Sequence, residues 1–214
     1  MTISELIPWL ENHLRNEKLP GVEAHRKMAS RYYKDLKDNP VVKEDQKKSA
    51  VCLLLYPKGD EIHFLLILRP KTHAHHAGQI ALPGGSCESD EEYQTTAIRE
   101  LQEETGIEIH PGCILGNLSP VYIPATNFFV QPMVAGVKTS IELIKTKEAD
   151  LFFEIPLKEF LDPKIIGETT VATPYDPTIH TPYFNIRGYV LWGATAMILN
   201  EFREVMAGYP SNAQ

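Results

Sequence analysis

The chain has 214 residues, of which 43% are hydrophobic and 23% charged, a composition typical of a globular protein with one substantial core. Its formal net charge of -7 argues against general nucleic-acid binding, because phosphate backbones attract basic surfaces. The 3 cysteines form no C-x-x-C pair, which predicts a reducing compartment and no disulfide framework.

The start of the chain shows no targeting pattern. The segment "MTISELIPWLENHL" is acidic and amphipathic, and it lacks the basic and apolar regions of a secretory signal. The longest apolar runs, such as "VCLLLY", have the length of a strand and not of a membrane-spanning helix. We therefore expect a cytoplasmic protein that does not associate with membranes.

The first part of the chain is predicted to be helical. Apolar residues at helical spacing predict a helix over residues 3–14, and a second helix is expected over 22–36, before a polar connector. We assign residues 1–48 to an N-terminal helical extension and residues 49–214 to the main domain. The extension has three open roles: it covers an active site, it forms the contacts of a homodimer, or it packs on a sheet.

The main domain predicts a mixed β-sheet with helices before, inside and after it, a fold of the α/β (α+β) class. Strands are expected over residues 49–56, 62–69, 78–83, 113–123, 127–137, 149–156, 164–173 and 181–186. Helices are expected over residues 90–105, 157–162 and 188–206. Gly106 is placed to end the first of these helices.

The helix over residues 90–105 is unusually acidic on one side. Glu100, Glu103 and Glu104 are neighbours on a helix surface, where like charges repel. A solvated charged face would tolerate this repulsion, whereas Mg²⁺ or Mn²⁺ would reverse it, because these ions prefer carboxylate and carbonyl oxygens. Gly84 and Gly85 have no side chain to block the approach of a backbone carbonyl. The glutamates alone leave both interpretations open.

The spacing around these glutamates carries more information. Gly85 is followed by five residues and Glu91, then by seven residues and "RELQEETGI", which begins at Arg99. This pattern is similar at every defined position to the Nudix hydrolase signature, G-x5-E-x7-R-E-U-x-E-E-x-G-U, in which U is a large aliphatic residue. The resemblance implies a Nudix fold, with a mixed sheet sandwiched between helices, and the metal-dependent hydrolysis of a nucleoside diphosphate linked to another moiety.

The resemblance also implies roles for residues of this chain. The metal ligands for Mg²⁺ or Mn²⁺ would be Glu100, Glu103, Glu104 and the carbonyl of Gly84, with Arg99 orienting the glutamates and with Gly85, Glu91 and Gly106 supporting the loop–helix–loop. A carboxylate near the attacking water would accept its proton. Glu100 and Glu103 are candidates for this base, as are the more distant Glu142, Glu148 and Glu168.

The segment upstream, "LLILRPKTHAHHAGQIALPGG", resembles the additional motif of the coenzyme A diphosphatase branch, L-L-T-x-R-S-x3-R-x3-G-x3-F-P-G-G. The matching positions are Leu65, Leu66, Arg69, Gly78, Pro83, Gly84 and Gly85, and Gln79 is also typical. The departures are Ile67, Pro70, Ala74 and Leu82. The resemblance implies cleavage of coenzyme A to 4′-phosphopantetheine and adenosine 3′,5′-bisphosphate.

The anionic part of such a substrate requires cations. Arg69, Lys71, His73 and His76 are the candidates, with His75 beside them, although Ala74 stands where the branch has an arginine. The histidines also fit an exposed loop, and a zinc site is disfavoured because no spaced cysteine or carboxylate accompanies them. The alternatives in function are a Nudix enzyme for ADP-ribose, an NDP-sugar or a dinucleoside polyphosphate, and a Nudix-derived module that binds without catalysis.

Overall fold

The computed structural model describes residues 1–33, 42–70, 78–172 and 178–210. The helices are α1 (Ile3–Asn16), α2 (Val22–Lys27), α3 (Tyr93–Thr105), α4 (Leu157–Leu161) and α5 (Gly193–Ala207). The strands are β1 (Lys47–Lys58), β2 (Glu61–Leu68), β3 (Ile80–Ala81), β4 (Gly84–Ser86), β5 (Ile114–Asn117), β6 (Val121–Ile123), β7 (Phe128–Gly136), β8 (Leu151–Pro156), β9 (Ile166–Val171), β10 (Ile179–Ile186) and β11 (Tyr189–Leu191).

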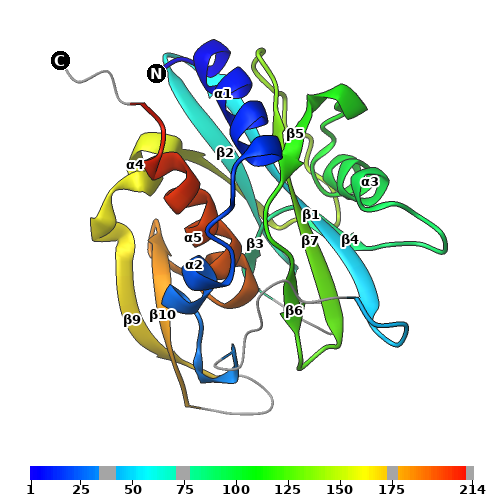
Figure 1. The fold of residues 1–214 in the computed structure, drawn as a ribbon, viewed down its shortest axis with the longest axis vertical. Helices are drawn as coiled ribbons and strands as arrows, with labels where there is room; N and C mark the ends of the chain where they lie inside the picture. Colours follow the sequence, from blue (N-terminus) through cyan, green and yellow to red (C-terminus); the bar gives the residue numbers. More distant parts are fainter. Residues whose placement is uncertain (34–41, 71–77, 173–177, 211–214) are drawn as a thin grey trace.

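The described strands form two sheets. The larger one has the order β3-β2-β1-β7-β5, with β4 paired to β1, β6 to β7 and β8 to β2. Strands β1 and β7 run parallel and the other pairs run antiparallel, so the sheet is mixed. Strands β9, β10 and β11 form a second, antiparallel sheet. Helix α3 lies on one side of the main sheet and α1, α2 and α5 lie toward the other side (Figure 1).

Strand β1 is apolar without alternation because both of its faces are covered. Leu53 and Leu55 belong to the core cluster that includes residues of α1 and α5, whereas Cys52 and Leu54 belong to the cluster under α3. The same division applies to β7, where Val134 faces the first cluster and Met133 the second. The predicted mixed sheet sandwiched between helices is therefore confirmed.

Helix α1 packs directly on the sheet. Its buried residues are Ile3, Leu6, Ile7, Leu10 and Leu14, and they join the same core cluster as β1, β2 and α5. Strand β5 accommodates the helix through Gly116, at which a Cβ would lie 2.6 Å from the Cβ of Leu14. Thr2 and Glu5 form a capping box at the N-terminal end of the helix. The extension thus contributes a layer of the core.

The structure corrects three predicted boundaries. Helix α2 ends at Lys27, not at residue 36, because the chain turns to bury Met28, and residues 34–36 lie outside the described part. Helix α3 begins at Tyr93 and not at residue 90. The last helix begins at Gly193, because residues 189–191 pair with β10 as β11. The two-residue turn of that hairpin, Arg187–Gly188, has positive φ at both positions, a pattern that favours such turns.

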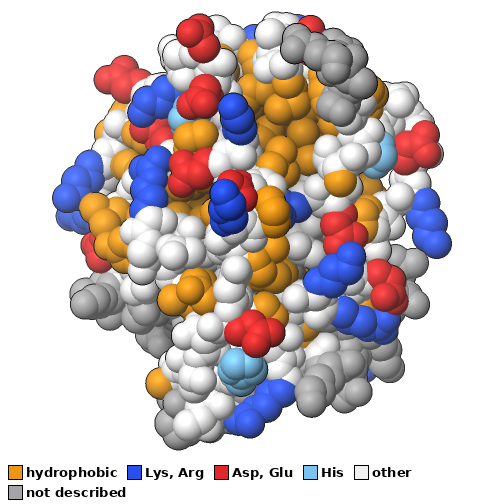
Figure 2. Space-filling model, turned by 90° about the vertical axis from the view of Figure 1, so that its left-hand side faces the viewer, with side chains coloured by type: hydrophobic (Ala, Val, Ile, Leu, Met, Phe, Trp, Pro, Cys, Tyr) orange, Lys and Arg blue, Asp and Glu red, His pale blue; other side chains and the backbone are white. Residues whose placement is uncertain are grey.

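The two sheets meet on the side of the molecule that carries β9 and α4. Figure 2 views this side and shows hydrophobic side chains exposed in a band between charged ones. Exposed large hydrophobic residues of the described strands include Leu151, Ile166, Tyr189 and Val190. The ring of Tyr189 meets that of Phe153 edge-on at 5.1 Å, which joins β11 to β8. Within the described ranges, no helix has the length and apolar content required to cross a membrane.

A buried carboxylate connects the extension to the last helix. Glu201 of α5 is fully buried, and its oxygens accept hydrogen bonds from the backbone N–H of Gly21 at 2.9 Å and of Ser119 at 2.9 Å. The hydroxyl of Ser119 donates at 2.6 Å, and Nε2 of His25 lies 3.1 Å away. These partners offset the desolvation of the charge, which would otherwise be costly.

Glu201→Gln is expected to lower the free energy of unfolding by about 3 kcal/mol, because the amide places a donor against donors that have no other acceptor in the core. Glu204→Gln is the matched control one turn later on α5, where the carboxylate is 30% exposed and binds Lys27 at 2.9 Å. The control should cost less than about 1 kcal/mol. Urea denaturation of both variants measures the difference, and equal losses would contradict the role of Glu201.

Candidate functional site

Strand β4 begins with Gly84 and Gly85 directly after a bend at Pro83, a segment that we call the glycine turn, and each glycine is required by a different contact. Gly84 has a φ of +151°, and a Cβ there would lie 2.3 Å from the carbonyl oxygen of Ala50 on β1. A Cβ on Gly85 would lie 2.4 Å from the carboxylate carbon of Glu100 on α3. The first glycine lets β4 pair with β1, and the second lets the glutamates approach the strand end.

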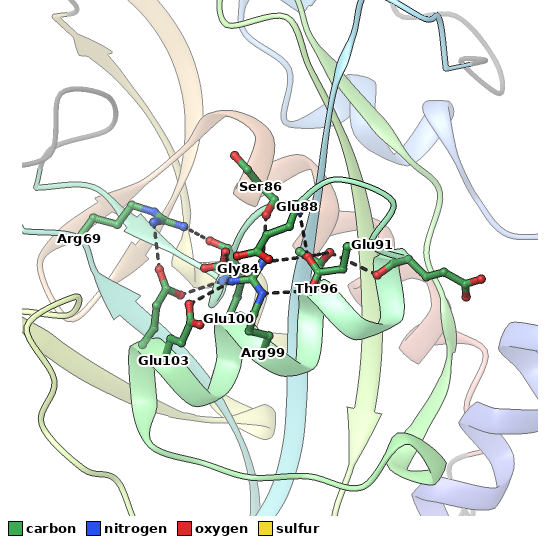
Figure 3. Close-up of polar contacts among 11 residues, drawn as sticks. Arg69, Gly84, Ser86, Glu88, Glu91, Thr96, Arg99, Glu100 and Glu103 are labelled. Carbon is green, nitrogen blue, oxygen red and sulfur yellow. Dashed lines mark hydrogen bonds and ion pairs between the residues drawn. The ribbon is translucent and has the colours of Figure 1, made fainter.

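Helix α3 is seated on the sheet by its apolar side. Ala97 and Leu101 are fully buried against Cys52 and Leu54 of β1. The helix ends as predicted at Gly106, whose φ of +75° suits a left-handed C-cap. Packed on the sheet in this way, α3 presents its acidic side to the glycine turn, as Figure 3 shows.

Arg99 gathers the carboxylates of the acidic side. Its Nη1 donates to Glu100 at 2.9 Å and to Glu103 at 3.0 Å. Its Nε and Nη2 each donate to Glu91 at 3.0 Å, and Nη2 also donates to the carbonyl of Ser86 at 3.1 Å. One guanidinium thereby offsets the repulsion among three carboxylates (Figure 3).

Glu91 is held in place from several directions, which the sequence pattern did not indicate. Its Oε2 accepts from the hydroxyl of Thr96 at 2.7 Å and from the N–H of Glu88 at 3.0 Å. Asp90, with a φ of +61°, turns the chain so that Glu91 precedes the helix and faces Arg99. Thr96 is therefore a supporting residue that was missed, and a threonine within a predicted helix gave no signal of it.

Glu104 is the most buried of the glutamates. Its side chain is 3% exposed, its Oε1 accepts from Nη1 of Arg69 at 3.0 Å, and its Oε2 accepts from the N–H of Gly84 at 2.8 Å. Nη2 of Arg69 donates to the carbonyl oxygen of Gly84 at 2.5 Å. The predicted ligands Gly84 and Glu104 therefore lie together, with Arg69 bridging them.

The pKa values of these carboxylates differ because their surroundings differ. Hydrogen bonds from Arg99 lower the pKa of Glu91 to about 2. Burial raises the pKa of Glu104 to about 7 against the pull of Arg69 and the Gly84 N–H, and the charges of Glu100 and Glu148 act in the same direction as burial. Burial also raises the pKa of Glu100. The neighbouring glutamates are thus unequal proton acceptors.

The donor set fits a hard cation. The carboxylates of Glu100 and Glu104 lie at the glycine turn with the Gly84 carbonyl, and Arg99 joins Glu103 to Glu100. Guanidinium groups already bind all four of these groups. Oxygen ligands of this kind suit Mg²⁺ or Mn²⁺. Over the described stretches of the chain, no three His, Cys, Asp or Glu side chains converge closely enough to hold a metal as they stand.

The structure separates the three distant candidates for the base. The segment with Glu148 packs on the end of α3, where Thr146 donates its hydroxyl to the carbonyl of Glu104 at 2.9 Å and accepts from the N–H of Glu148 at 3.2 Å. Glu168 lies on β9 in the second sheet, 3.2 Å from His180. Glu142 is exposed.

The predicted substrate contacts are only partly described. Lys71, His73 and His76 lie outside the described residues, as do Ala74 and His75. Arg69 is described, and it contacts the glutamate cluster. The N–H of Arg69 donates to the carbonyl of Gln79 and the N–H of Gly78 to the carbonyl of Arg69, both at 3.0 Å, so the two ends of the histidine-rich segment meet beside the site.

A cavity lies beside the site, not in it. Its volume is about 870 Å³, and it opens between the end of α1, the start of α3 and the edge strand β5. Its lining includes Arg15, Lys48, Tyr93 and Asn117, and it shares Glu91 with the carboxylate cluster. The glutamates that follow on α3 are not part of its wall.

Known proteins resemble this chain in sequence and fold. A NUDIX domain family model matches residues 46–164. The peroxisomal coenzyme A diphosphatase ndx-8 of Caenorhabditis elegans is 31% identical over 133 residues, which cover 60% of this chain and only 56% of that protein. NudL of Yersinia pestis (strain Pestoides F), named an uncharacterized Nudix hydrolase, is 31% identical over 150 residues, covering 65% of this chain and 71% of that protein. The crystal structure of a MutT/nudix family protein from Enterococcus faecalis matches with a TM-score of 0.56 and 18% identity, covering 92% of this chain and 73% of that one.

Glu91→Gln is expected to lower the free energy of unfolding by about 2 kcal/mol at neutral pH, because Arg99 loses its paired acceptor. The folded pKa of Glu91, about 2, lies below its ordinary value of 4.5, so the stabilisation is complete above pH 4.5 and is lost as the pH falls toward 2. The difference between wild type and variant should therefore shrink over this range in urea denaturation. A difference that does not change with pH would contradict the assignment.

Proposed function

The chain belongs to the Nudix family, whose hydrolases generally use divalent metal ions, and from this premise we propose that it is a diphosphatase with coenzyme A as its substrate. The products are 4′-phosphopantetheine and adenosine 3′,5′-bisphosphate. The observation that carries the proposal is the meeting of Glu100 and Glu104 with the glycine turn, at one end of the motif that includes Arg69. Glu103 is joined to Glu100 through Arg99.

A bound Mg²⁺ or Mn²⁺ would neutralise the diphosphate and lower the pKa of a water molecule at the site. Glu100, Glu103, Glu104 and the carbonyl of Gly84 would hold the ion. Arg99 keeps the first two carboxylates side by side, and the N–H of Gly84 keeps Glu104 against the turn. Such preorganisation reduces the cost of assembling a cluster of like charges when the ion binds.

Water cleaves the diphosphate by adding its oxygen to one phosphorus while the bridging oxygen leaves with the other. The proton of that water requires an acceptor. We favour Glu148 among the distant candidates, because its segment is hydrogen-bonded to the end of α3 and its charge acts on Glu104. Glu168 is less suited, since it lies on the second sheet with His180 as its partner.

Coenzyme A is favoured over other diphosphates by two observations. Arg69, a matching position of the upstream motif, lies at the glutamate cluster. The C. elegans relative, at 31% identity, is named a coenzyme A diphosphatase. The second candidate is a Nudix diphosphatase for ADP-ribose, an NDP-sugar or a dinucleoside polyphosphate, and Ala74 in place of the motif's second arginine is what favours it. The retention of the three box glutamates disfavours a non-catalytic binding module.

Two further parts of the proposal concern the setting of the enzyme. We propose a cytoplasmic location, although the C. elegans relative is named peroxisomal. We also propose that small nucleotides are its ligands and that nucleic acids are not, in keeping with the net charge of -7. Association as a homodimer stays a prediction.

Coenzyme A is expected to be cleaved faster than ADP-ribose, an NDP-sugar or a dinucleoside polyphosphate when each is supplied at equal concentration with Mg²⁺ or Mn²⁺. Product chromatography with phosphate-sensitive detection gives kcat/KM for each compound. Preferential cleavage of ADP-ribose with coenzyme A left intact would replace the proposed substrate with the second candidate.

Glu103→Gln is expected to lower kcat by about 100-fold or more with little loss of stability, because the side chain is a proposed metal ligand and is 47% exposed. Glu108→Gln is the control, since Glu108 is an exposed glutamate after α3 that accepts from Gln102 at 2.7 Å. The control should keep kcat within about twofold of wild type. Unchanged turnover in Glu103→Gln would refute the ligand assignment.

A further inference from the structure

Arg69 contacts two of the proposed metal ligands. Its side chain is 21% exposed, its Nη1 lies 3.0 Å from Oε1 of Glu104, and its Nη2 lies 2.5 Å from the carbonyl oxygen of Gly84. The resemblance to the coenzyme A diphosphatase motif makes this arginine a candidate for binding the anionic part of the substrate. In the structure, its guanidinium instead binds the Glu104 carboxylate and the Gly84 carbonyl, which a divalent cation would use. Figure 3 shows Arg69 pointing toward Gly84.

The backbone fixes Arg69 at this place. It directly follows β2, and the hydrogen bonds that join it to Gln79 and Gly78 continue the pairing of β2 with β3. Gly84 is fixed by its pairing with Val51 on β1, the strand next to β2. The meeting of Arg69 with Gly84 therefore follows from the register of the sheet.

A divalent cation and this guanidinium compete for the same oxygen atoms. Mg²⁺ binds its ligands at about 2.1 Å. An ion at that distance from the Gly84 carbonyl oxygen would lie no more than about 4.6 Å from the guanidinium nitrogen that is 2.5 Å from the same oxygen. Two positive charges this close repel strongly in a partly buried site, where solvent screens them little.

Glu104 does not depend on Arg69 alone for its position. The N–H of Gly84 donates to its other oxygen at 2.8 Å. The carboxylate therefore stays at the turn when the guanidinium leaves, and Oε1 becomes available to another cation. The charge of the buried carboxylate still requires a positive partner, which the incoming ion would supply.

The second arginine of the site differs in this respect. Arg99 is anchored by two hydrogen bonds to Glu91, a carboxylate outside the proposed ligand set. Within the described residues, the side-chain hydrogen bonds of Arg69 go only to proposed ligands, Glu104 and Gly84. Arg69 is thus the arginine that an incoming metal ion would displace, and Arg99 the one that would remain.

We infer that Arg69 is a built-in counter-cation that exchanges with the divalent metal ion. Its guanidinium bridges Gly84 and Glu104 while the ion is absent, and it leaves the Gly84 carbonyl when the ion binds. Arg69 acts as a positioning residue in the first state, and its released donors are available to an anionic phosphate in the second. The inference rests on the metal site proposed above.

The test is Mn²⁺ binding to the full chain without substrate, after chelator treatment, with free Mn²⁺ followed by its electron paramagnetic resonance signal. Arg69→Gln should bind Mn²⁺ about tenfold more tightly than wild type, because a competing unit charge is removed. Arg69→Lys, whose single ammonium cannot bridge both groups as the fork does, should bind about threefold more tightly. Arg15→Gln is the matched control, since Arg15 also joins a carbonyl, that of Leu115 at 3.2 Å, and a carboxylate, that of Glu11 at 3.0 Å.

Thermal unfolding provides a second measurement. Without metal, Arg69→Gln should melt at a lower temperature than wild type, because Glu104 loses its cation. Saturating Mn²⁺ should remove most of this difference in melting temperature between the variant and wild type. If Arg69 were purely structural, Mn²⁺ would not change the difference in melting temperature, and the substitution would not alter the Mn²⁺ affinity.

The outcomes distinguish this inference from the proposed function. Wild type that binds Mn²⁺ while Arg69→Gln binds it equally or more weakly would overturn the exchange and leave the metal site intact. Failure of both wild type and Arg69→Gln to bind Mn²⁺ would overturn both. If Arg69→Gln does not fold, an unchanged Mn²⁺ affinity in Arg69→Lys overturns the exchange.

Discussion

The guanidinium of Arg99 binds three carboxylates at once, and the arrangement of the site depends on this interaction. Glu100 and Glu103 would repel each other on an open helix. Arg99 offsets that repulsion, and its own place is set by Glu91, which Thr96 and Glu88 hold in front of the helix. A loop before α3 thus determines where charges within α3 lie.

The glycine turn complements this charge. The carboxylate of Glu100 occupies the space that a side chain on Gly85 would fill, and the close pairing of β4 with β1 fills the space beside Gly84. Both glycines are therefore required by tertiary contacts. The carbonyl of Gly84 accepts from a guanidinium and its N–H donates to Glu104, so one residue contacts both kinds of charge.

The sequence predicted the parts of the site that are local. Membership of the Nudix family, the mixed sheet and the acidic helix are confirmed, because the box fixes residues over a short stretch of chain. The helical period placed Glu100, Glu103 and Glu104 on one side but could not rank their burial, which leaves side chains 14%, 47% and 3% exposed.

The contacts that the sequence could not predict join distant segments. Arg69 lies 35 positions from Glu104, and His25 lies 176 positions from Glu201. Strand register and helix packing determine these partners, and local sequence patterns do not predict either of them. The hairpin at Arg187–Gly188 was predictable from its turn, but the apolar stripe that follows it favoured a longer helix. The described part of the N-terminal extension packs into the core, and the assignment of residues 1–48 to an extension of the domain that follows stays a prediction.

The packing of α3 on β1 determines where the proposed metal ligands lie. Leu101 and Ala97 lie against Cys52 and Leu54 of β1, and the same strand pairs with the glycine turn through Val51. One strand therefore positions both the helix that carries the glutamates and the carbonyl that faces them. A change in the packing beneath α3 would alter the distance between Glu104 and the turn, because interiors are close-packed and transmit such shifts. The metal affinity that we propose for the site would thus depend on core residues that are not among its proposed ligands.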